Sequence, residues 1–294
     1  MKLSVILILI AFSLSAPGQD MRGIWIGYLD TDVRNITALE VNYILHIKDQ
    51  DQNIVNGKAY LFRDNPLRAE GILDFIGIVS NNTLNISELK ILHSKIPSDS
   101  TRFLCIKQLK LRLSKENETE NLTGTFTGAG ENLVQCFPGN AYLQRFNSIN
   151  QKNIPSEILS KILLDGRDPN VFMQTKLARP IVLEVQNNVI QLEIKDYLKE
   201  DGDIVSVYHN RRPFIRNQTI LNKSSFHTLR LNRSMELHEI IMYAENLGQI
   251  PPNTSNLIVY DGAKAHEVII RSSKEVSAVV YLRYMPEERS PQNN

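Results

Sequence analysis

An excess of charge of either sign is missing from this sequence. It holds 33 lysine and arginine residues against 32 aspartate and glutamate residues. Nucleic-acid recognition normally leaves a basic footprint on a chain, so this balance gives no reason to expect a nucleic-acid partner. Lys110 and Arg112 alternate with Leu109, Leu111 and Leu113. That alternation indicates the solvated face of a strand rather than a phosphate-binding stripe.

The motifs of the common enzyme classes are also missing. The sequence has no G-x-S-x-G nucleophile elbow, no glycine-rich phosphate loop and no dinucleotide fingerprint. The segment HEIIM, from His238 to Met242, begins like a zinc-protease helix but lacks the second histidine. We therefore predict a protein that is not an enzyme and uses no cofactor. A pair of carboxylates that meet only in the folded chain stays open as an alternative.

Long apolar runs are absent except near the first residue. There, one lysine precedes an apolar run from Leu3 to Leu14 and the small residues Ser15, Ala16 and Gly18, which is the three-part pattern of a secretory signal peptide. The run is shorter than the about 20 residues that a transmembrane helix needs. We expect removal of residues 1–18, a mature chain without a transmembrane segment, and export to the periplasm, the cell surface or the medium.

Cysteine is scarce, with only Cys105 and Cys136 in the chain. In an oxidising compartment such a pair favours one structural disulfide. Closing a loop of about 30 residues is worth about 3–4 kcal/mol in the chain-entropy model. The alternative, a reactive thiol or a metal ligand, needs a nearby histidine or further cysteines, which the sequence does not provide.

What the first half does contain is alternation with a period of two. From Leu39 to Ile47 every odd position is apolar, as in a strand with one buried face. Similar stretches begin near Ile24, Val55, Leu73, Leu84, Leu109, Leu122 and Tyr142. We expect about eight strands across residues 21–146, closed as an up-and-down barrel because closure leaves no edge unpaired.

Short motifs in this half resemble the lipocalin and avidin-like barrels. Gly23-Ile24-Trp25-Ile26-Gly27 is similar to their G-x-W start, while Val55–Ala59 and Leu122–Phe126 are similar to later strand openings. Arg145 falls on the last strand, where many lipocalins place a basic residue against the tryptophan. The resemblance implies a small barrel able to hold one small apolar molecule. The interior candidates are Trp25, Tyr43, Phe75, Phe103 and Phe126. The alternative is an interior filled by these same side chains.

A change of period marks residues 147–180 as a linker. Ile158, Leu159, Ile162 and Leu163 recur at helical spacing between Pro155-Ser156 and Asp165-Gly166. Those flanking residues are start and stop signals for one short amphipathic helix. We expect its apolar face to pack on the barrel wall or at the domain junction.

Residues 181–285 return to short strands every 8 to 12 residues, a spacing typical of a β-sandwich. Ile190, Leu192 and Ile194 alternate with polar residues, and the pattern continues to Leu282. Tyr281 and Arg283 are expected on the opposite face. Residues 286–294 are expected to form a disordered tail. The predicted fold is thus all-β, with a barrel, a short helix and a sandwich in order.

Three segments of this second half resemble a domain of secreted and cell-surface proteins of Bacteroidetes-type bacteria. They are DGDIVSVYHN from Asp201, AENLGQIPPNT from Ala244 and YDG from Tyr260. The resemblance implies location and fold rather than an activity. Pro251 and Pro252 cannot donate to a strand ladder, so the second segment is interpreted as a stiff connection between strands that could cross from one sheet to the other. A ligand-contacting loop is the alternative.

Asp196, Asp201 and Asp203 are the best candidates for metal binding, because three carboxylates near one hairpin offer the oxygen ligands that Ca²⁺ prefers. Their spacing is not that of an EF-hand, and Asp-Gly is also a favoured hairpin turn. We therefore favour a turn and assign no metal.

These observations lead to one functional hypothesis. The chain is expected to be an exported, non-enzymatic binding protein, with a small apolar ligand in the barrel or a cell-surface protein or glycan on the sandwich. A secreted hydrolase and a structural or adhesion module are the alternatives. The lining of the space inside residues 21–146 is the feature that separates them.

Overall fold

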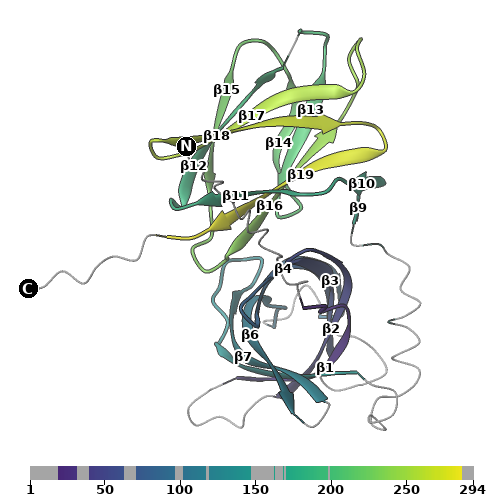
Figure 1. Ribbon diagram of the computed structural model, residues 1–294, viewed down its shortest axis with the longest axis vertical. Helices are drawn as coiled ribbons and strands as arrows, with labels where there is room; N and C mark the ends of the chain where they lie inside the picture. Colours follow the sequence, from purple (N-terminus) through teal and green to yellow (C-terminus); the bar gives the residue numbers. More distant parts are fainter. Residues whose placement is uncertain are drawn as a thin grey trace, which may run out of the picture.

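A computed structural model describes residues 19–31, 40–62, 71–96, 102–116, 119–146, 162, 168, 170–197 and 199–286. Figure 1 shows two stacked units, a ring of strands from the first half and a two-sheet unit from the second. Except for Ile162, the regular structure of the described residues is strand, which confirms the all-β class. No helix among the described residues is long and apolar enough to cross a membrane.

The first unit is a closed antiparallel barrel in sequence order, as predicted. Its strands are β1 (Gly23–Thr31), β2 (Glu40–Asp51), β3 (Ile54–Phe62), β4 (Gly71–Ser80), β5 (Thr83–Ser94), β6 (Ile106–Glu116), β7 (Thr119–Ala129) and β8 (Gly139–Arg145). Pairing of β1 with β8, from Trp25 opposite Arg145 to Thr31 opposite Gly139, closes the ring. Closure satisfies the backbone groups that an edge strand would leave unpaired.

The alternating apolar residues of the barrel strands point inward and form one contiguous core. Trp25 closes one end of this core. It is fully buried and its Nε1 donates to the carbonyl of Met21 at 2.9 Å. The Arg145 guanidinium lies 4.6 Å from the centre of the Trp25 ring and donates to the carbonyls of Arg22 and Asp20. A cation over an aromatic face is attracted by the ring quadrupole, so Arg145 fixes the closed end.

The second unit consists of two sheets. One has the order β14-β13-β16-β19-β10-β9, with β11 also paired to β19, and the other has the order β15-β12-β17-β18. The strands are β9 (Val171–Phe172), β10 (Thr175–Leu177), β11 (Ile181–Val185), β12 (Val189–Asp196), β13 (Ile204–His209), β14 (Arg212–Thr219), β15 (Ser225–Arg230), β16 (Leu237–Ala244), β17 (Asn253–Asp261), β18 (Lys264–Ser272) and β19 (Val276–Tyr284). Both sheets contribute to a single apolar core.

Two strands of this unit lie where the sequence indicated a linker. β9 and β10 pair with each other, and β10 runs parallel to β19 through Lys176 and Leu177. The predicted linker thus contains two short strands in its last part. Strands of two and three residues are too short to show a period, so alternation could not reveal them.

The predicted helix falls almost wholly outside the described residues, as do the predicted signal peptide and residues 287–294 of the predicted tail. Ile162 alone is described. It is helical and buried. It packs in a cluster with Ile24, Ile44, Tyr60 and Phe62 on the outer wall of the barrel. The expected contact between this segment and the wall is thus present at Ile162.

An apolar cluster and a buried ion network join the two units. Outward residues of β3, β4 and β5, namely Ile54, Ile76, Ile78 and Leu89, pack with Phe172, Met235, Leu237, Ile241, Val279 and Tyr281. Tyr281 faces away from the two-sheet core, as its position in the strand predicted. Next to this cluster, Arg211 donates to Asp74 of β4 and to Glu239 of β16. The barrel wall is therefore a packing surface for the second unit.

The segment from Ala244 to Thr254 connects β16 in one sheet with β17 in the other. Asp201 holds this connection, because its Oδ2 accepts from Ile250 N at 2.7 Å and its carbonyl accepts from Gln249 N. The Asn246 side chain accepts from Ile204 N and donates to the Gly202 carbonyl. Ladder pairing lapses at the two prolines, and the expected crossing between sheets is present.

Candidate functional site

Four of the five aromatic residues proposed for the barrel interior lie in its core. Trp25, Tyr43, Phe75 and Phe126 are all buried there. Phe103 is the exception, since it is 38% exposed and precedes the start of β6. The expectation that it lines the interior is wrong. Its ring instead lies against Gly130 in the connection between β7 and β8, a contact that strand periodicity cannot indicate.

Cys105 and Cys136 form the predicted disulfide, with Cα atoms 6.3 Å apart. The bond ties the connection between β5 and β6 to the connection between β7 and β8. Both connections lie at the end of the barrel opposite Trp25. Backbone hydrogen bonds from Cys136 N to Gly128 O and from Gly130 N to Val134 O complete this clasp. The disulfide therefore fixes the wall beside which the candidate site opens.

A polar triad lies inside the barrel next to the disulfide. The Tyr43 hydroxyl donates to Glu88 Oε1 at 2.7 Å, and the Lys107 backbone N–H donates to Glu88 Oε2 at 2.6 Å. Lys107 Nζ donates to the Cys105 carbonyl at 2.9 Å and to Glu88 Oε2 at 3.3 Å. All three side chains are buried. Burial, followed by the charge of Glu88, raises the pKa of Tyr43 well above its usual value.

The three candidate calcium ligands border one small pocket of about 180 Å³ in the two-sheet unit. Asp201 and Asp203 are used there as loop acceptors, the latter for Thr254 N at 3.3 Å. Lys199 also lines this pocket. Among the described residues, no group of three or more His, Cys, Asp or Glu side chains has the geometry to hold a metal ion. The contacts match those of a turn clamp.

A crevice lies between the two units. β5 and β6 pair only from Thr83 opposite Arg112 to Ser87 opposite Gln108, so the strands are no longer paired beyond that point. A crevice of about 230 Å³ borders this gap. The barrel contributes Glu88, Gln108 and Gln135, and the second unit contributes His209, Arg212 and Ser234. Crevices between structural units are common places for small-molecule sites.

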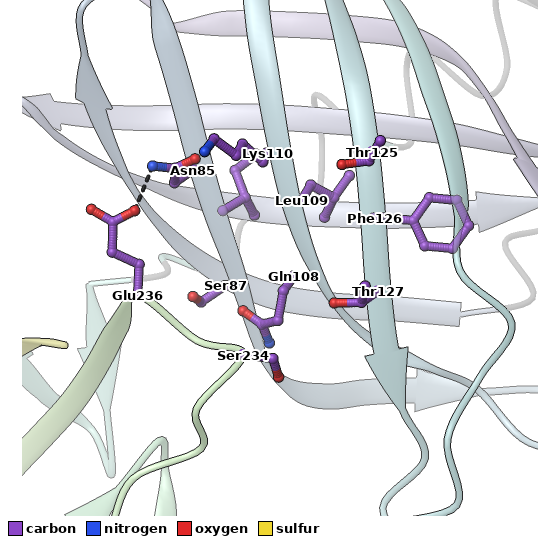
Figure 2. Close-up of a pocket in the computed structure, with 11 residues that line it drawn as sticks. Asn85, Ser87, Gln108, Leu109, Lys110, Thr125, Phe126, Thr127, Ser234 and Glu236 are labelled. Carbon is purple, nitrogen blue, oxygen red and sulfur yellow. Dashed lines mark hydrogen bonds between the residues drawn. The ribbon is translucent and has the colours of Figure 1, made fainter. Parts of the chain in front are cut away.

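One atom in the crevice wall is unsatisfied by the protein. Gln108 Oε1 is buried and has no hydrogen-bond partner among the residues that the structure describes. A second pocket, of about 180 Å³, shares Gln108 and Ser234 with the first. Figure 2 shows the side chains of Gln108, Ser87 and Ser234 gathered at the junction, with Asn85 bonded to Glu236 nearby. Because buried polar atoms nearly always have a partner, Gln108 marks the place where an external donor fits.

No protein-family model and no curated protein matches this chain.

The histidines of the junction are held neutral. His238 Nε2 donates to the Asn232 carbonyl at 3.2 Å, which leaves His238 Nδ1 to accept from His209 Nε2 at 3.0 Å. Burial lowers the pKa of His209 to about 4, with the charge of Arg212 as a further cause. Burial likewise lowers the pKa of His238 to about 3. Near pH 7 this pair is a neutral hydrogen-bonding unit.

An ion pair crosses the mouth of the crevice. Arg212 Nη2 in β14 donates to Glu131 Oε1 at 3.1 Å, and Glu131 belongs to the disulfide-tied connection of the barrel. Both side chains are exposed, so the contact adds little stability. Its position still places one cation beside the entrance.

Sequence reasoning missed the residues of this crevice. Glu88 carried a usable signal, because it follows Leu84 and Ile86 on the inward face of a strand. Gln108, His209 and Arg212 carried none. They come from strands of different units and meet only when the second unit packs on the barrel wall.

Proposed function

We propose that this protein is a non-enzymatic binding protein that holds a small polar ligand in the crevice between its two units. The observation that carries the proposal is the buried, unpartnered Oε1 of Gln108 at a crevice of about 230 Å³. A ligand with an N–H or O–H group would satisfy this oxygen and recover the cost of leaving it unbonded.

The size and polarity of the crevice limit the ligand. Its volume is below the about 300–1,000 Å³ usual for drug-sized molecules, which favours a ligand of the size of an amino acid or a monosaccharide. The lining offers amides and hydroxyls from Gln108, Gln135 and Ser234, and the ion pair of Arg212 with Glu131 places one charge of each sign at the entrance. These groups favour a neutral or zwitterionic ligand that bears hydroxyls or amides.

The barrel serves in this proposal as a scaffold. Its inward side chains form one contiguous buried core around Trp25, Tyr43 and Phe75, and an eight-stranded barrel is narrow enough for side chains to fill it. Glu88 is a buried charged group in this core, and Tyr43 and Lys107 already satisfy it. This packing supports a ligand outside the barrel rather than an apolar ligand within it.

Export and the lack of catalysis are parts of the same proposal. The disulfide favours an oxidising compartment, in agreement with the signal-peptide pattern of residues 1–18. Glu88 in the crevice wall already accepts from Tyr43 and from the Lys107 backbone N–H, so both of its oxygens are engaged. A general base needs a free lone pair within reach of a substrate proton, which Glu88 does not offer, and this supports binding over hydrolysis.

Melting-temperature measurements with a panel of amino acids, amides and monosaccharides test this proposal. At least one compound should raise the melting temperature of the full chain, because a ligand that binds only the folded state stabilises it. Gln108→Met should lose that shift, whereas Gln191→Met on the exposed face of β12 should keep it. A panel with no effect on the parent protein, or equal shifts in both variants, would count against the site. Turnover of ester or glycoside substrates would contradict the absence of catalysis.

A further inference from the structure

A second polar surface lies on the outer face of the barrel, and the two tyrosines at its centre do not line the crevice. Strand registers align Asn42, Tyr28, Tyr142, Thr123 and Arg112 in one row across β2, β1, β8, β7 and β6. Their chain neighbours Leu29, Ala141, Leu122 and Leu111 are buried in the barrel core. Side chains alternate across a strand, so all five members of the row point outward.

Two tyrosines form the centre of this row. The rings of Tyr28 and Tyr142 have centroids 5.1 Å apart and planes tilted by 31°. They are 37% and 40% exposed, although both belong to strands in the middle of a closed sheet. A cross-strand aromatic pair stabilises a sheet, but that role alone does not explain why the neighbouring outward side chains are polar. Exposed aromatic faces pack well against the C–H face of a sugar ring, because the ring face is electron-rich.

The adjacent row is also polar and leads into a hollow. It runs from Asp30 through Asn140, Thr125 and Lys110 to Asn85. The last three residues line the pocket of about 180 Å³ at the junction, and Figure 2 shows them on its barrel wall. Neither row contains an aliphatic side chain. Protein interfaces have an apolar centre, so the composition favours a hydroxyl-rich ligand over a protein.

The charges of the two rows are separated along the surface. Within the part of the chain that the structure describes, Lys110 and Arg112 on β6 form no ion pair. Asp30 on β1 has an Oδ1 without a hydrogen-bond partner among the described residues. A carboxylate would be attracted to the β6 end, where arginine can bind it with two parallel N–H groups. Sugar hydroxyls would donate to Asp30 and to the amide oxygens near the tyrosines.

We propose that this face binds a short acidic oligosaccharide, with sugar rings on Tyr28 and Tyr142 and a uronate carboxylate at Lys110 and Arg112. Neither Tyr28 nor Tyr142 lines the crevice between the units. Replacing the two tyrosines should therefore remove binding to this face and leave binding in the crevice unchanged. This inference does not depend on the function proposed above.

Affinity electrophoresis of the full chain in native gels tests the proposal. The gels would contain polygalacturonate, neutral dextran or polyglutamate, the last being an acidic polymer without sugar rings. We expect retardation by polygalacturonate alone. The double variant Tyr28→Ala/Tyr142→Ala should weaken it by about tenfold or more, as expected for aromatic anchors. Lys110→Gln/Arg112→Gln should weaken it similarly.

Matched controls are available on the second unit. Tyr197 is also 40% exposed, so Tyr197→Ala should leave retardation unchanged. Lys264→Gln/Arg271→Gln removes two exposed cations of β18 and should have the same null effect. Circular dichroism of each variant would verify folding. The proposal is overturned if polygalacturonate does not retard the parent protein, if polyglutamate retards it equally, or if the Tyr28/Tyr142 variant folds and binds like the parent.

Discussion

Arg211 Nη1 lies 2.7 Å from Asp74 Oδ2, and this contact joins the turn after β13 to barrel strand β4. Arg211 Nε also donates to Glu239 Oε2 at 3.0 Å. All three side chains are buried. One cation thus bonds to two carboxylates, one from each unit, at the junction.

Replacing Arg211 tests how tightly the units are joined. Arg211→Met removes the cation that bonds to both buried carboxylates, Asp74 and Glu239, so the free energy of unfolding should fall by about 3–5 kcal/mol. Arg212→Met, which removes an exposed pair with Glu131, should cost less than about 1 kcal/mol. Urea unfolding of both variants measures the difference. Equal losses would contradict a buried, charge-dependent junction.

The triad inside the barrel gives a second prediction. Lys107→Met strands the buried carboxylate of Glu88 and should cost about 3–5 kcal/mol. The triple variant Tyr43→Phe/Glu88→Met/Lys107→Met removes all three polar side chains and leaves only the Lys107 backbone N–H and the Cys105 carbonyl without their partners, so it should recover part of that loss. Urea unfolding measures both values. A triple variant as unstable as the single one would show that the triad itself, rather than its unpaired remainder, stabilises the barrel.

Two glycines near Asp201 separate backbone strain from steric conflict. Gly202 has a φ of +89° and open space where a Cβ would lie, so Gly202→Ala should cost about 1–2 kcal/mol through backbone strain alone. Gly248 has a φ of +54°, and a Cβ there would meet the Asp201 carboxylate, which holds Ile250 N. Gly248→Ala should therefore cost about 1 kcal/mol more. Thermal unfolding of both variants measures these losses. A larger loss for Gly202→Ala than for Gly248→Ala would contradict the role of the Asp201 carboxylate in holding Ile250 N.

Asp203 makes a pH-dependent contribution to stability. Burial, followed by the charge of Asp201, raises its pKa to about 6, above the about 3.9 of an unfolded chain. The folded state therefore holds the proton more tightly, and the stability from this group is present below about pH 4 and lost as pH rises through about 6. Relative to the parent protein, Asp203→Asn should gain stability across that window. Glu275→Gln, at an exposed position, should not. Urea unfolding at each pH measures the free energy of unfolding of the parent protein and of Asp203→Asn. A constant difference between the two proteins from pH 4 to pH 7 would contradict the raised pKa of Asp203.

Loss of the disulfide should destabilise the folded chain without changing the barrel topology. The cysteines are separated by 31 residues, for which the chain-entropy model gives about 3–4 kcal/mol. Cys105→Ser/Cys136→Ser should show this loss in urea unfolding, and reducing agent should shift the parent protein but not the variant. An effect of reductant on the variant would point to another target.

The alternation of side chains was sufficient to predict much of the fold. A buried face every second residue identified the strands of the barrel, from the run through Tyr43, Leu45 and Ile47 to Leu143 on β8. Local rules also located the disulfide and the strand connection at Pro251-Pro252. These features depend on a residue and its near neighbours, and the sequence records them directly.

Only the tertiary structure decided where the candidate sites lie. Gln108 faces the crevice because β6 separates from β5 and the second unit covers the gap. Tyr28 and Tyr142 meet because β1 pairs with β8, strands that lie more than a hundred residues apart. Phe103 has the side chain of a core residue, yet it precedes the first residue of β6 and is exposed. A sequence determines which faces of its strands are apolar. Contacts between distant strands depend in addition on how the barrel closes and how the second unit packs on its wall, and both depend on packing interactions summed over the whole chain.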